Sequence, residues 1–422
     1  MHPDLHRRTE CRLCGSEDLV KVIQLAPIPP ANELLSAEEL SITQDTFPLD
    51  VHFCNDCCHV QLLDVVDPER LFRNYVYVSG TSPVFRQHFR DYAAELVQSY
   101  GLGKESFVID IGSNDGTLLA CFKELCVARI QGVDPAIAIA ATASQAGVPT
   151  ITEFFTPAVA DKIVASAGKA DVVVANNVFA HVDDLQSFAA GVARVLKDGG
   201  IFVIEVAYLK DLMEKTLFDT IYHEHLDYHT LAPLVRFLAS HGLQAIDARC
   251  VDTHGGSLRV VARKGSCPGD VQPSVAELVE QEQCLGLFDP ATYLAFNDRI
   301  NELGDRFVKV LDEIKSRGKS IAGFGLPAKA TTLMHQFRID GRYIDYVVDD
   351  NPMKQSLYSP GYKIPIHSST RLSSHRPDYI LVLAWNFAES VIKRLDWFLD
   401  AGGKIIVPLP RLEILDKDSR RC

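Results

Sequence analysis

The chain has 422 residues, of which 47% are hydrophobic and 23% charged, so we expect two or three domains of a soluble globular protein. Acidic residues outnumber basic ones by 55 to 42, and a net charge of −13 argues against a nucleic-acid-binding protein, which would carry a basic face. No apolar run is long enough to span a membrane and the N-terminus lacks the features of a signal peptide, so we expect a cytoplasmic protein.

Two Cys-x-x-Cys pairs near the N-terminus predict a metal site. Cys11 and Cys14 form the first pair, and Cys54 and Cys57 form the second. Four thiolates at this spacing suit tetrahedral zinc, and no open coordination position is indicated, so we predict a structural zinc ion. The alternative is a group of reduced cysteines in the protein core.

An aromatic segment with Tyr75 and Tyr77 follows the cysteines. It leads into Ser79-Gly80-Thr81-Ser82 and then into a predicted helix that starts near Pro83. Two tyrosines beside a small, hydroxylated loop could reach over an active site. The segment could equally serve as packing between two domains.

The stretch from 107 to 120 predicts a buried parallel strand, a glycine turn and the start of a helix. Such a unit forms a nucleotide-sized crevice at the carboxyl edge of a sheet. The next predicted strand, 128–133, ends in an acid that is placed to accept ribose hydroxyl groups. The candidate cofactor-binding residues are Asp110, Gly112, Asn114, Gly116 and Asp134.

The chemistry of the turn separates two cofactors. A dinucleotide site uses three glycines so that a pyrophosphate can sit on the helix N-terminus. Here Asp115 stands where a phosphate would be repelled. S-adenosylmethionine has no phosphate and carries a cationic ammonium and sulfonium, so we predict this cofactor. The alternative is an ordinary strand-to-helix turn.

Strand and helix patterns continue to alternate through the middle of the chain. Strands are predicted at 171–175 and 201–205, and 255–262 is expected to close the domain as an edge strand. This order predicts a doubly wound parallel sheet with one antiparallel strand. Asn176 and His181 follow a strand's carboxyl end, where ligands bind, although His181 could also be a core histidine.

The densest group of titratable side chains lies between 222 and 229. His225 and His229 have the spacing of a helical metal pair, but the stretch lacks a helical apolar period and the sequence after His225 does not match a metalloprotease motif. Acid–base chemistry is favoured because histidine titrates near neutrality. The candidates are Tyr222, Glu224 and His225.

The last third predicts a helical connector, 274–317, broken at Asp289-Pro290, and then a second, smaller Rossmann-like unit. Its glycine turn and first helical turn would form a phosphate-sized anion site. A purely structural domain is the alternative. The candidate substrate-binding residues are Gly323, Gly325, Lys329, Asp350 and Asn386.

Taken together, these motifs resemble the S-adenosylmethionine-dependent C-methyltransferases of nucleotide-linked 4-keto-deoxysugars, including the C-3 methyltransferases of antibiotic sugar pathways. The resemblance covers nearly the whole chain. It implies a zinc-binding module at 1–72, a methyltransferase domain at 73–265 and a Rossmann-like domain at 266–422 that helps to hold the nucleotide sugar. The motifs that carry it are the two cysteine pairs, Asp110-Ile-Gly112-Ser-Asn-Asp-Gly116, Tyr222-His-Glu224-His225, His254-Gly-Gly-Ser-Leu-Arg259, Gly323-Phe-Gly325-Leu-Pro-Ala-Lys329 and Val348-Asp-Asp-Asn351-Pro.

The resemblance further implies that His225 is the catalytic base, and that Tyr222, Glu224, His181 and the segment with Tyr75 and Tyr77 line the pocket. The base would remove a proton next to the keto group and so create the carbon nucleophile. O- or N-methylation of a nucleotide sugar, or a nucleotide-sugar-binding protein without catalysis, are the alternatives. We expect a monomer that binds neither nucleic acid nor membrane.

Overall fold

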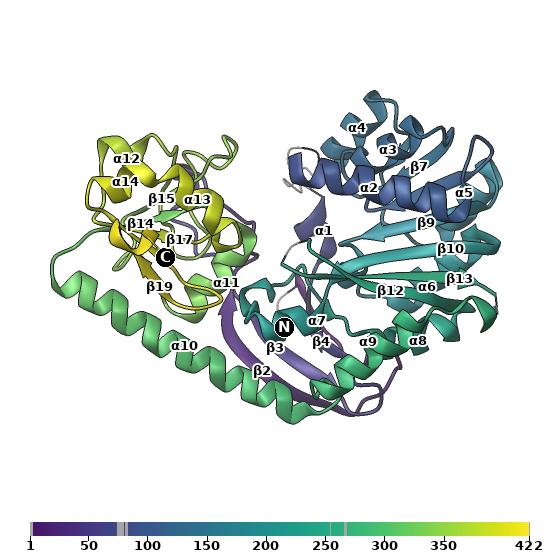
Figure 1. The fold of residues 1–422 in the computed structure, drawn as a ribbon, viewed down its shortest axis with the longest axis horizontal. Helices are drawn as coiled ribbons and strands as arrows, with labels where there is room; N and C mark the ends of the chain where they lie inside the picture. The colour runs from purple at the N-terminus through teal and green to yellow at the C-terminus, as the bar shows by residue number, and fades with distance from the viewer. Residues whose placement is uncertain (1–2, 74–79, 81–82, 254, 266–267, 422) are drawn as a thin grey trace.

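The computed structural model describes residues 3–73, 80, 83–253, 255–265 and 268–421. It is an α/β protein in which two largely parallel sheets stand on either side of a small antiparallel sheet (Figure 1). Tyr75, Tyr77 and His254 lie outside the described residues. Within these ranges, no helix has both the length and the apolar character needed to cross a membrane.

The cysteine-containing module is built on a four-stranded sheet of order β11-β4-β3-β2. Its β3 ends at Cys54, so a regular strand delivers one of the predicted metal ligands. The strand β11 (Asp227–Tyr228) comes from the middle of the chain and pairs with β4. The other elements are β1 (Leu5–Arg7), β2 (Leu19–Ile28), η1 (Ala37–Glu39), β3 (Phe47–Cys54), β4 (Val60–Leu62), β5 (Asp64–Val66) and α1 (Pro68–Phe72).

The central sheet has the order β12-β13-β10-β9-β6-β7-β8. The prediction of a parallel sheet with one antiparallel strand is confirmed, since only β13 runs against the others. The expectation that this strand forms the edge is wrong, because β12 lies outside it. Six consecutive buried residues at the start of β13 explain its interior place, since both of its faces are covered.

The elements of the central part are α2 (Pro83–Tyr100), β6 (Phe107–Ile111), α3 (Thr117–Glu124), β7 (Arg129–Val133), α4 (Ile137–Gln145), β8 (Thr150–Ile151), α5 (Pro157–Ala167), β9 (Ala170–Asn176), η3 (Phe179–His181), α6 (Leu185–Val195), β10 (Leu196–Ala207), α7 (Leu209–Glu214), η4 (Phe218–Thr220), α8 (Leu231–Ser240), β12 (Leu243–Val251) and β13 (Ser257–Lys264).

The C-terminal sheet, of order β16-β15-β14-β17-β18-β19, is parallel except for β19. The predicted break in the connector is present: α9 ends at Cys284, and α10 begins at Pro290 with Asp289 as its N-cap. The elements are η5 (Pro268–Asp270), α9 (Pro273–Cys284), α10 (Pro290–Ser316), β14 (Ile321–Phe324), α11 (Ala328–Gln336), β15 (Tyr346–Val348), β16 (Ile366–His367), α12 (Arg371–Ser374), β17 (Tyr379–Val382), η6 (Trp385–Phe387), α13 (Ala388–Arg394), α14 (Asp396–Asp400), β18 (Lys404–Val407), β19 (Glu413–Leu415) and η7 (Asp418–Arg421).

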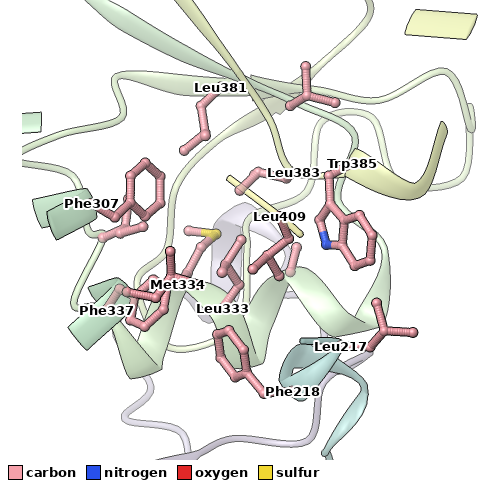
Figure 2. Packing of buried hydrophobic residues seen from close by; sticks show 14 of the residues in the cluster. Leu217, Phe218, Phe307, Leu333, Met334, Phe337, Leu381, Leu383, Trp385 and Leu409 are labelled. Carbon is pink, nitrogen blue, oxygen red and sulfur yellow. The ribbon is translucent and has the colours of Figure 1, made fainter. Parts of the chain in front are cut away.

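One hydrophobic core joins the C-terminal sheet to the cysteine module and to the segment around η4. Figure 2 shows Phe218 beneath α11, and its ring lies 5.2 Å from that of Phe337. A second core joins Cys11 and Cys54 to one face of the central sheet. The segment from 217 to 229 therefore lies where all three parts of the molecule meet.

Candidate active site

The four predicted metal ligands converge on one point. The sulfur atoms of Cys11, Cys14, Cys54 and Cys57 all lie within 4.8 Å of one another. The Sγ atoms of Cys11 and Cys57 are 3.5 Å apart, and those of Cys14 and Cys54 are 3.6 Å apart. Tetrahedral zinc with Zn–S bonds of about 2.3 Å places its sulfurs at about this separation. The donor set therefore fits a zinc ion without an open coordination position.

The turn after β6 has the backbone shape that the glycine predicts. Gly112 has φ = +70°, and a Cβ atom there would approach a methyl group of Val178 to 2.1 Å. Its N–H donates to the carbonyl of Val133 at 2.7 Å, which ties the turn to the next strand. The N-cap of α3 is Gly116, whereas the Asp115 side chain accepts the N–H groups of Gly80 and Thr117. Only a residue without a side chain can follow β6 here.

Carboxylates surround this turn. Asp134 accepts the N–H of Asn114 at 2.8 Å and that of Ala136 at 2.9 Å, so its side chain stabilises the loop. Burial, and then the charges of Asp134 and Asp115, raise the pKa of Asp110 well above its usual range. A cation bound here would stabilise these acids, which fits the ammonium and sulfonium of S-adenosylmethionine.

Two polar side chains, Ser113 and Asn176, lie beside the turn. The Ser113 hydroxyl and the Asn176 amide are buried, and neither makes a well-formed hydrogen bond with a described residue. They follow β6 and end β9, which are neighbours in the sheet. Buried polar groups of this kind are normally satisfied, so the edge is suited to a polar ligand.

A stack of rings lies next to this edge. The rings of Phe72 and His181 are 5.6 Å apart and nearly parallel, and those of His181 and His225 are 5.0 Å apart. Tyr222 follows, with its ring 4.1 Å from His225. Arg73 donates to the carbonyl of Pro135, so the stack borders the loop that Asp134 holds. The structure thus brings together His181, Tyr222 and His225 from two predicted segments. Phe72, which was not among the predicted site residues, also belongs to the stack.

The backbone fixes the tautomer of His225. Its Nδ1 lies 2.7 Å from the carbonyl oxygen of Thr220, and since a carbonyl only accepts, Nδ1 carries the proton. In the neutral ring, Nε2 then holds a lone pair. A neutral imidazole with an unprotonated Nε2 is the form that a general base requires.

The carboxylate of Glu224 is bound by a residue that is distant in the sequence. Its Oε1 accepts from the Asn32 amide at 3.0 Å, whereas its Oε2 has no hydrogen-bond partner among the described residues. Burial raises the pKa of Glu224 to about 7, and hydrogen bonds from its own backbone and from Asn32 oppose that shift. A carboxyl group that titrates near neutrality can both accept and donate a hydrogen bond.

The other two histidines of the cluster face the protein interior. His223 Nε2 lies near the carbonyl oxygens of Phe47 and Pro48, and burial lowers its pKa to about 4. Burial, and then the neighbouring His59, also lowers the pKa of His229 to about 4. Both are neutral at physiological pH, which leaves His225 as the partly exposed histidine of the segment.

The segment that carries these residues is held from three sides. The N–H of Leu226 donates to Ala180 of the central part, and the N–H of Leu62 in the cysteine module donates to the carbonyl of Leu226. From the C-terminal sheet side, the buried Thr332 hydroxyl of α11 donates to the carbonyl of Ile221 at 2.8 Å. The candidate residues of this segment are therefore held in place by contacts with residues distant in sequence.

The C-terminal unit repeats the hydrogen bonds of the central turn. Gly325, with φ = +77°, donates to the carbonyl of Val348 at 2.7 Å. Asp349 then accepts the N–H of Leu326 and that of Asn351, both at 2.8 Å. This is the arrangement of Gly112 and Asp134, so a second nucleotide-sized turn faces the end of a parallel sheet.

Lys329 is a mostly buried cation on the first turn of α11. Its Nζ lies 3.6 Å from the ring centroid of Trp385, whose indole N–H donates to Asp219 at 2.6 Å. No carboxylate of a described residue forms an ion pair with Lys329, and burial lowers its pKa against the opposing charge of Asp219. An anion at this helix N-terminus would provide the missing partner.

The other three predicted substrate-binding residues lie in different environments. Gly323 lies inside β14, where a Cβ would approach Val347 to 2.9 Å, so packing explains this glycine. Asp350 is bound by Arg394 at 2.6 Å, and that hydrogen bond lowers its pKa. Asn386 is exposed, directly after the buried Trp385.

Comparison with known proteins gives three family matches. Residues 11–72 match a putative zinc-binding domain, 85–248 a methyltransferase domain, and 252–410 the C-terminal domain of C-methyltransferases. The chain is 35% identical to the C-methyltransferase NovU of Streptomyces niveus over 410 residues, 97% of both proteins.

More distant relatives match only part of the chain. A ubiquinone biosynthesis O-methyltransferase of Methylobacterium sp. (strain 4-46) is 34% identical over 129 residues, 29% of this chain and 50% of that protein. Among solved structures, a magnesium protoporphyrin IX methyltransferase of Synechocystis PCC 6803 with bound S-adenosylmethionine is 16% identical. It covers 43% of this chain and 79% of its own, with a TM-score of 0.33.

Proposed function

Because this chain belongs to the family of S-adenosylmethionine-dependent C-methyltransferases that includes NovU, we propose that it methylates a nucleotide-linked 4-keto-deoxysugar at C-3. The observation that carries the proposal is the tautomer of His225, which leaves Nε2 unprotonated beside His181 and Tyr222. Carbon is a poor nucleophile unless an adjacent carbonyl can take up the charge. A base therefore has to act next to a ketone.

His225 removes the proton from C-3 through Nε2, and the negative charge moves to the oxygen of the 4-keto group. A positioned base accelerates such a step by roughly 10²- to 10⁴-fold. The proton stays on the imidazolium, which its Nδ1–H bond to Thr220 keeps oriented, and later passes to water.

The enolate oxygen needs hydrogen-bond donors. Tyr222 and His181 flank His225 in the ring stack and are placed to supply them. One such donor contributes about 3 kcal/mol of transition-state stabilisation. Tyr75 and Tyr77 remain candidates, since both lie outside the described residues.

When bound, S-adenosylmethionine supplies an electrophilic methyl group. Asp110, Asp134, Asn176 and the Gly112 turn would hold its polar and cationic parts. The C-3 carbanion forms the new C–C bond as the S–CH₃ bond breaks, with S-adenosylhomocysteine as the leaving group. Holding both reactants in one crevice supplies much of the rate through proximity.

Lys329 and the Gly325 turn would bind the diphosphate of the nucleotide. The lysine lacks an ion-pair partner among the described residues and stands at a helix N-terminus, which favours an anion. Lys329 also belongs to the C-terminal unit, whose Thr332 holds residues 217–229, which we call the catalytic segment.

The proposal is tested by incubating the protein with dTDP-, GDP- and CDP-linked 4-keto-deoxysugars. We expect mass spectrometry to show one added methyl group, and NMR to place it on a carbon next to the keto group. In D₂O the same carbon should exchange its hydrogen, and this exchange should require His225. A methyl group found on oxygen or nitrogen, or no turnover with any keto sugar, would refute the proposal.

A further inference from the structure

We propose that Asn32, in the zinc module, is a positioning residue of the active site: its amide holds one oxygen of Glu224 and thereby presents the other oxygen to a hydroxyl group of the acceptor. This inference rests on the proposed function, because it assigns Glu224 to the acceptor pocket. It gives the zinc module a part in catalysis besides folding.

Asn32 is held rigidly in its loop. The carbonyl of Ala31 accepts from the buried Thr331 hydroxyl of α11 at 3.1 Å. The Glu33 carboxylate binds Arg70 through two hydrogen bonds of 3.0 Å. Leu35 then forms an isolated β-bridge with Tyr358 of the C-terminal unit. Contacts on both sides of Asn32 thus limit how far its amide can move.

Glu224 has one oxygen bound and one oxygen free. Its side chain is only 2% exposed, and the Asn32 Nδ2 atom lies 3.0 Å from Oε1. An amide NH₂ can only donate, so Oε1 must be an acceptor. Any proton on the carboxyl group then resides on Oε2, the atom without a partner among the described residues. The asparagine therefore decides which oxygen is left to bind a further group.

No charged residue contributes to the raised pKa of Glu224, which comes from burial. Charged and titratable groups do lie on the elements around it. Arg70 and Glu33 of the zinc module are paired with each other, Lys329 stands on α11, and His223 and His225 flank Glu224 in the chain. Asn32 is thus the neutral side-chain donor whose hydrogen bond opposes the effect of burial on this pKa.

The test compares Asn32→Leu and Asn32→Asp with the wild type. Leucine keeps the size and removes the donor, so we expect kcat to fall on the order of 10- to 100-fold, with the dissociation constant for S-adenosylmethionine unchanged. In the Asn32→Leu variant, the acidic limb of the plot of kcat against pH should move to higher pH. Aspartate can share one proton with Glu224, so activity of this variant should recover at low pH and be lost at high pH.

Asn297→Ala is the matched control. Asn297 also joins the zinc module to a C-terminal helix, because its side chain accepts the N–H of Gln24 at 2.9 Å, and it makes no hydrogen bond with residues 217–229 in the part of the chain that the structure describes. We expect it to leave kcat and the pH profile unchanged. Equal zinc content and equal melting temperature in the Asn32 variants would exclude a folding defect.

Two results would overturn the inference. One is a wild-type pH profile in both Asn32 variants, and the other is an equal loss of activity in Asn297→Ala. A second readout separates this inference from the proposed function: the ¹³C titration of the Glu224 carboxyl, assigned with Glu224→Gln, needs no acceptor. Its pKa should rise in Asn32→Leu even if no sugar is turned over. An unchanged titration contradicts the role of Asn32, whereas an inactive wild type contradicts the sugar.

Discussion

The imidazole rings of His181 and His225 lie 5.0 Å apart and within 23° of parallel, although they come from segments that belong to different cores. A hydrogen bond between the immediate neighbours of these residues, from Leu226 to Ala180, holds the two segments together. The arrangement places one imidazole beside the edge where the cofactor is expected and the other directly against Tyr222. The proposed base and the proposed donors to the enolate oxygen are therefore neighbours, as their action on one ligand requires.

His225→Asn should bind both substrates but lose most turnover. Asparagine retains a polar side chain but has no basic nitrogen, so we expect methyl transfer to fall by roughly 10²- to 10⁴-fold. Exchange of the C-3 hydrogen in D₂O should fall in parallel, whereas binding of S-adenosylmethionine, measured by calorimetry, should not change. His241→Asn, which alters a histidine bound to Gln186, is the control. Near-normal exchange in His225→Asn would show that another group is the base.

Glu224→Gln should raise stability while lowering activity. Burial raises the pKa of Glu224 from 4.5 to about 7, so the folded state retains a proton that the unfolded state releases. Stability is then fully present below pH 4.5 and falls as the pH rises towards 7, by about 3 kcal/mol in total. Glutamine cannot ionise. Denaturant titrations should therefore give wild type and variant similar stability at pH 4.5, and a more stable variant at pH 8. If the free energy of unfolding varied with pH in the same way in wild type and variant, the Glu224 carboxyl would not be buried and neutral.

Glu205 should affect stability in the opposite direction, because its contribution is lost in acid. Burial alone would raise its pKa, but the hydrogen bond from His88 and the charge of Arg259 outweigh it and lower the pKa from 4.5 to about 2. Its stabilisation is therefore present above pH 4.5 and is lost as the pH falls through 2, on the order of 3 kcal/mol. Glu205→Gln should flatten this acid limb in urea titrations. It should also be less stable at pH 7, because His88 and Arg259 lose their common partner.

The sequence predicted what local patterns determine. Strand and helix alternation gave the two parallel sheets, and the spacing of the cysteines gave the metal ligands, because both depend on residues close together in the chain. It could not predict Asn32 beside Glu224, or Phe72 beside His181, since each contact joins residues more than 100 positions apart in the chain.

The wrong expectation for the edge strand has the same cause. The edge position of β12 follows from how the last two strands pair, which the glycine break before β13 did not reveal. In the C-terminal unit, Asn386 remains a predicted substrate-binding residue. The hydrogen bond between the neighbouring Trp385 and Asp219 joins residues 166 positions apart, so the sequence around the strand end could not indicate it.

Lys329→Met should weaken binding of the nucleotide sugar without impairing the fold. Methionine keeps the apolar contact with Trp385 but removes the charge, so a hydrogen-bonded charge pair worth about 1.5–3 kcal/mol is lost. We expect KM for the sugar to rise about 10-fold or more, with kcat little changed. Removing a mostly buried ammonium that forms no ion pair with a described residue should leave the melting temperature equal or higher. Lys363→Met removes a lysine bound to the carbonyls of Leu40 and Ile42 and serves as the control. An unchanged KM would place the diphosphate elsewhere.

Removal of zinc should disable the catalytic segment before the parallel sheets unfold. Cys54 ends β3, whose neighbour β4 pairs with β11 only two residues after His225. A four-thiolate zinc site contributes about 10–16 kcal/mol of binding free energy, so its loss should loosen this small sheet first. We expect one zinc per chain by atomic absorption, and a lower melting temperature and little turnover in Cys54→Ser. Cys284→Ser changes an exposed cysteine outside the cluster and should behave as wild type. Because the core that joins α2 and α3 to the central sheet contains none of the four cysteines, Cys54→Ser should still bind S-adenosylmethionine. Full activity in a protein without zinc would show that the cysteine module does not hold His225 in place.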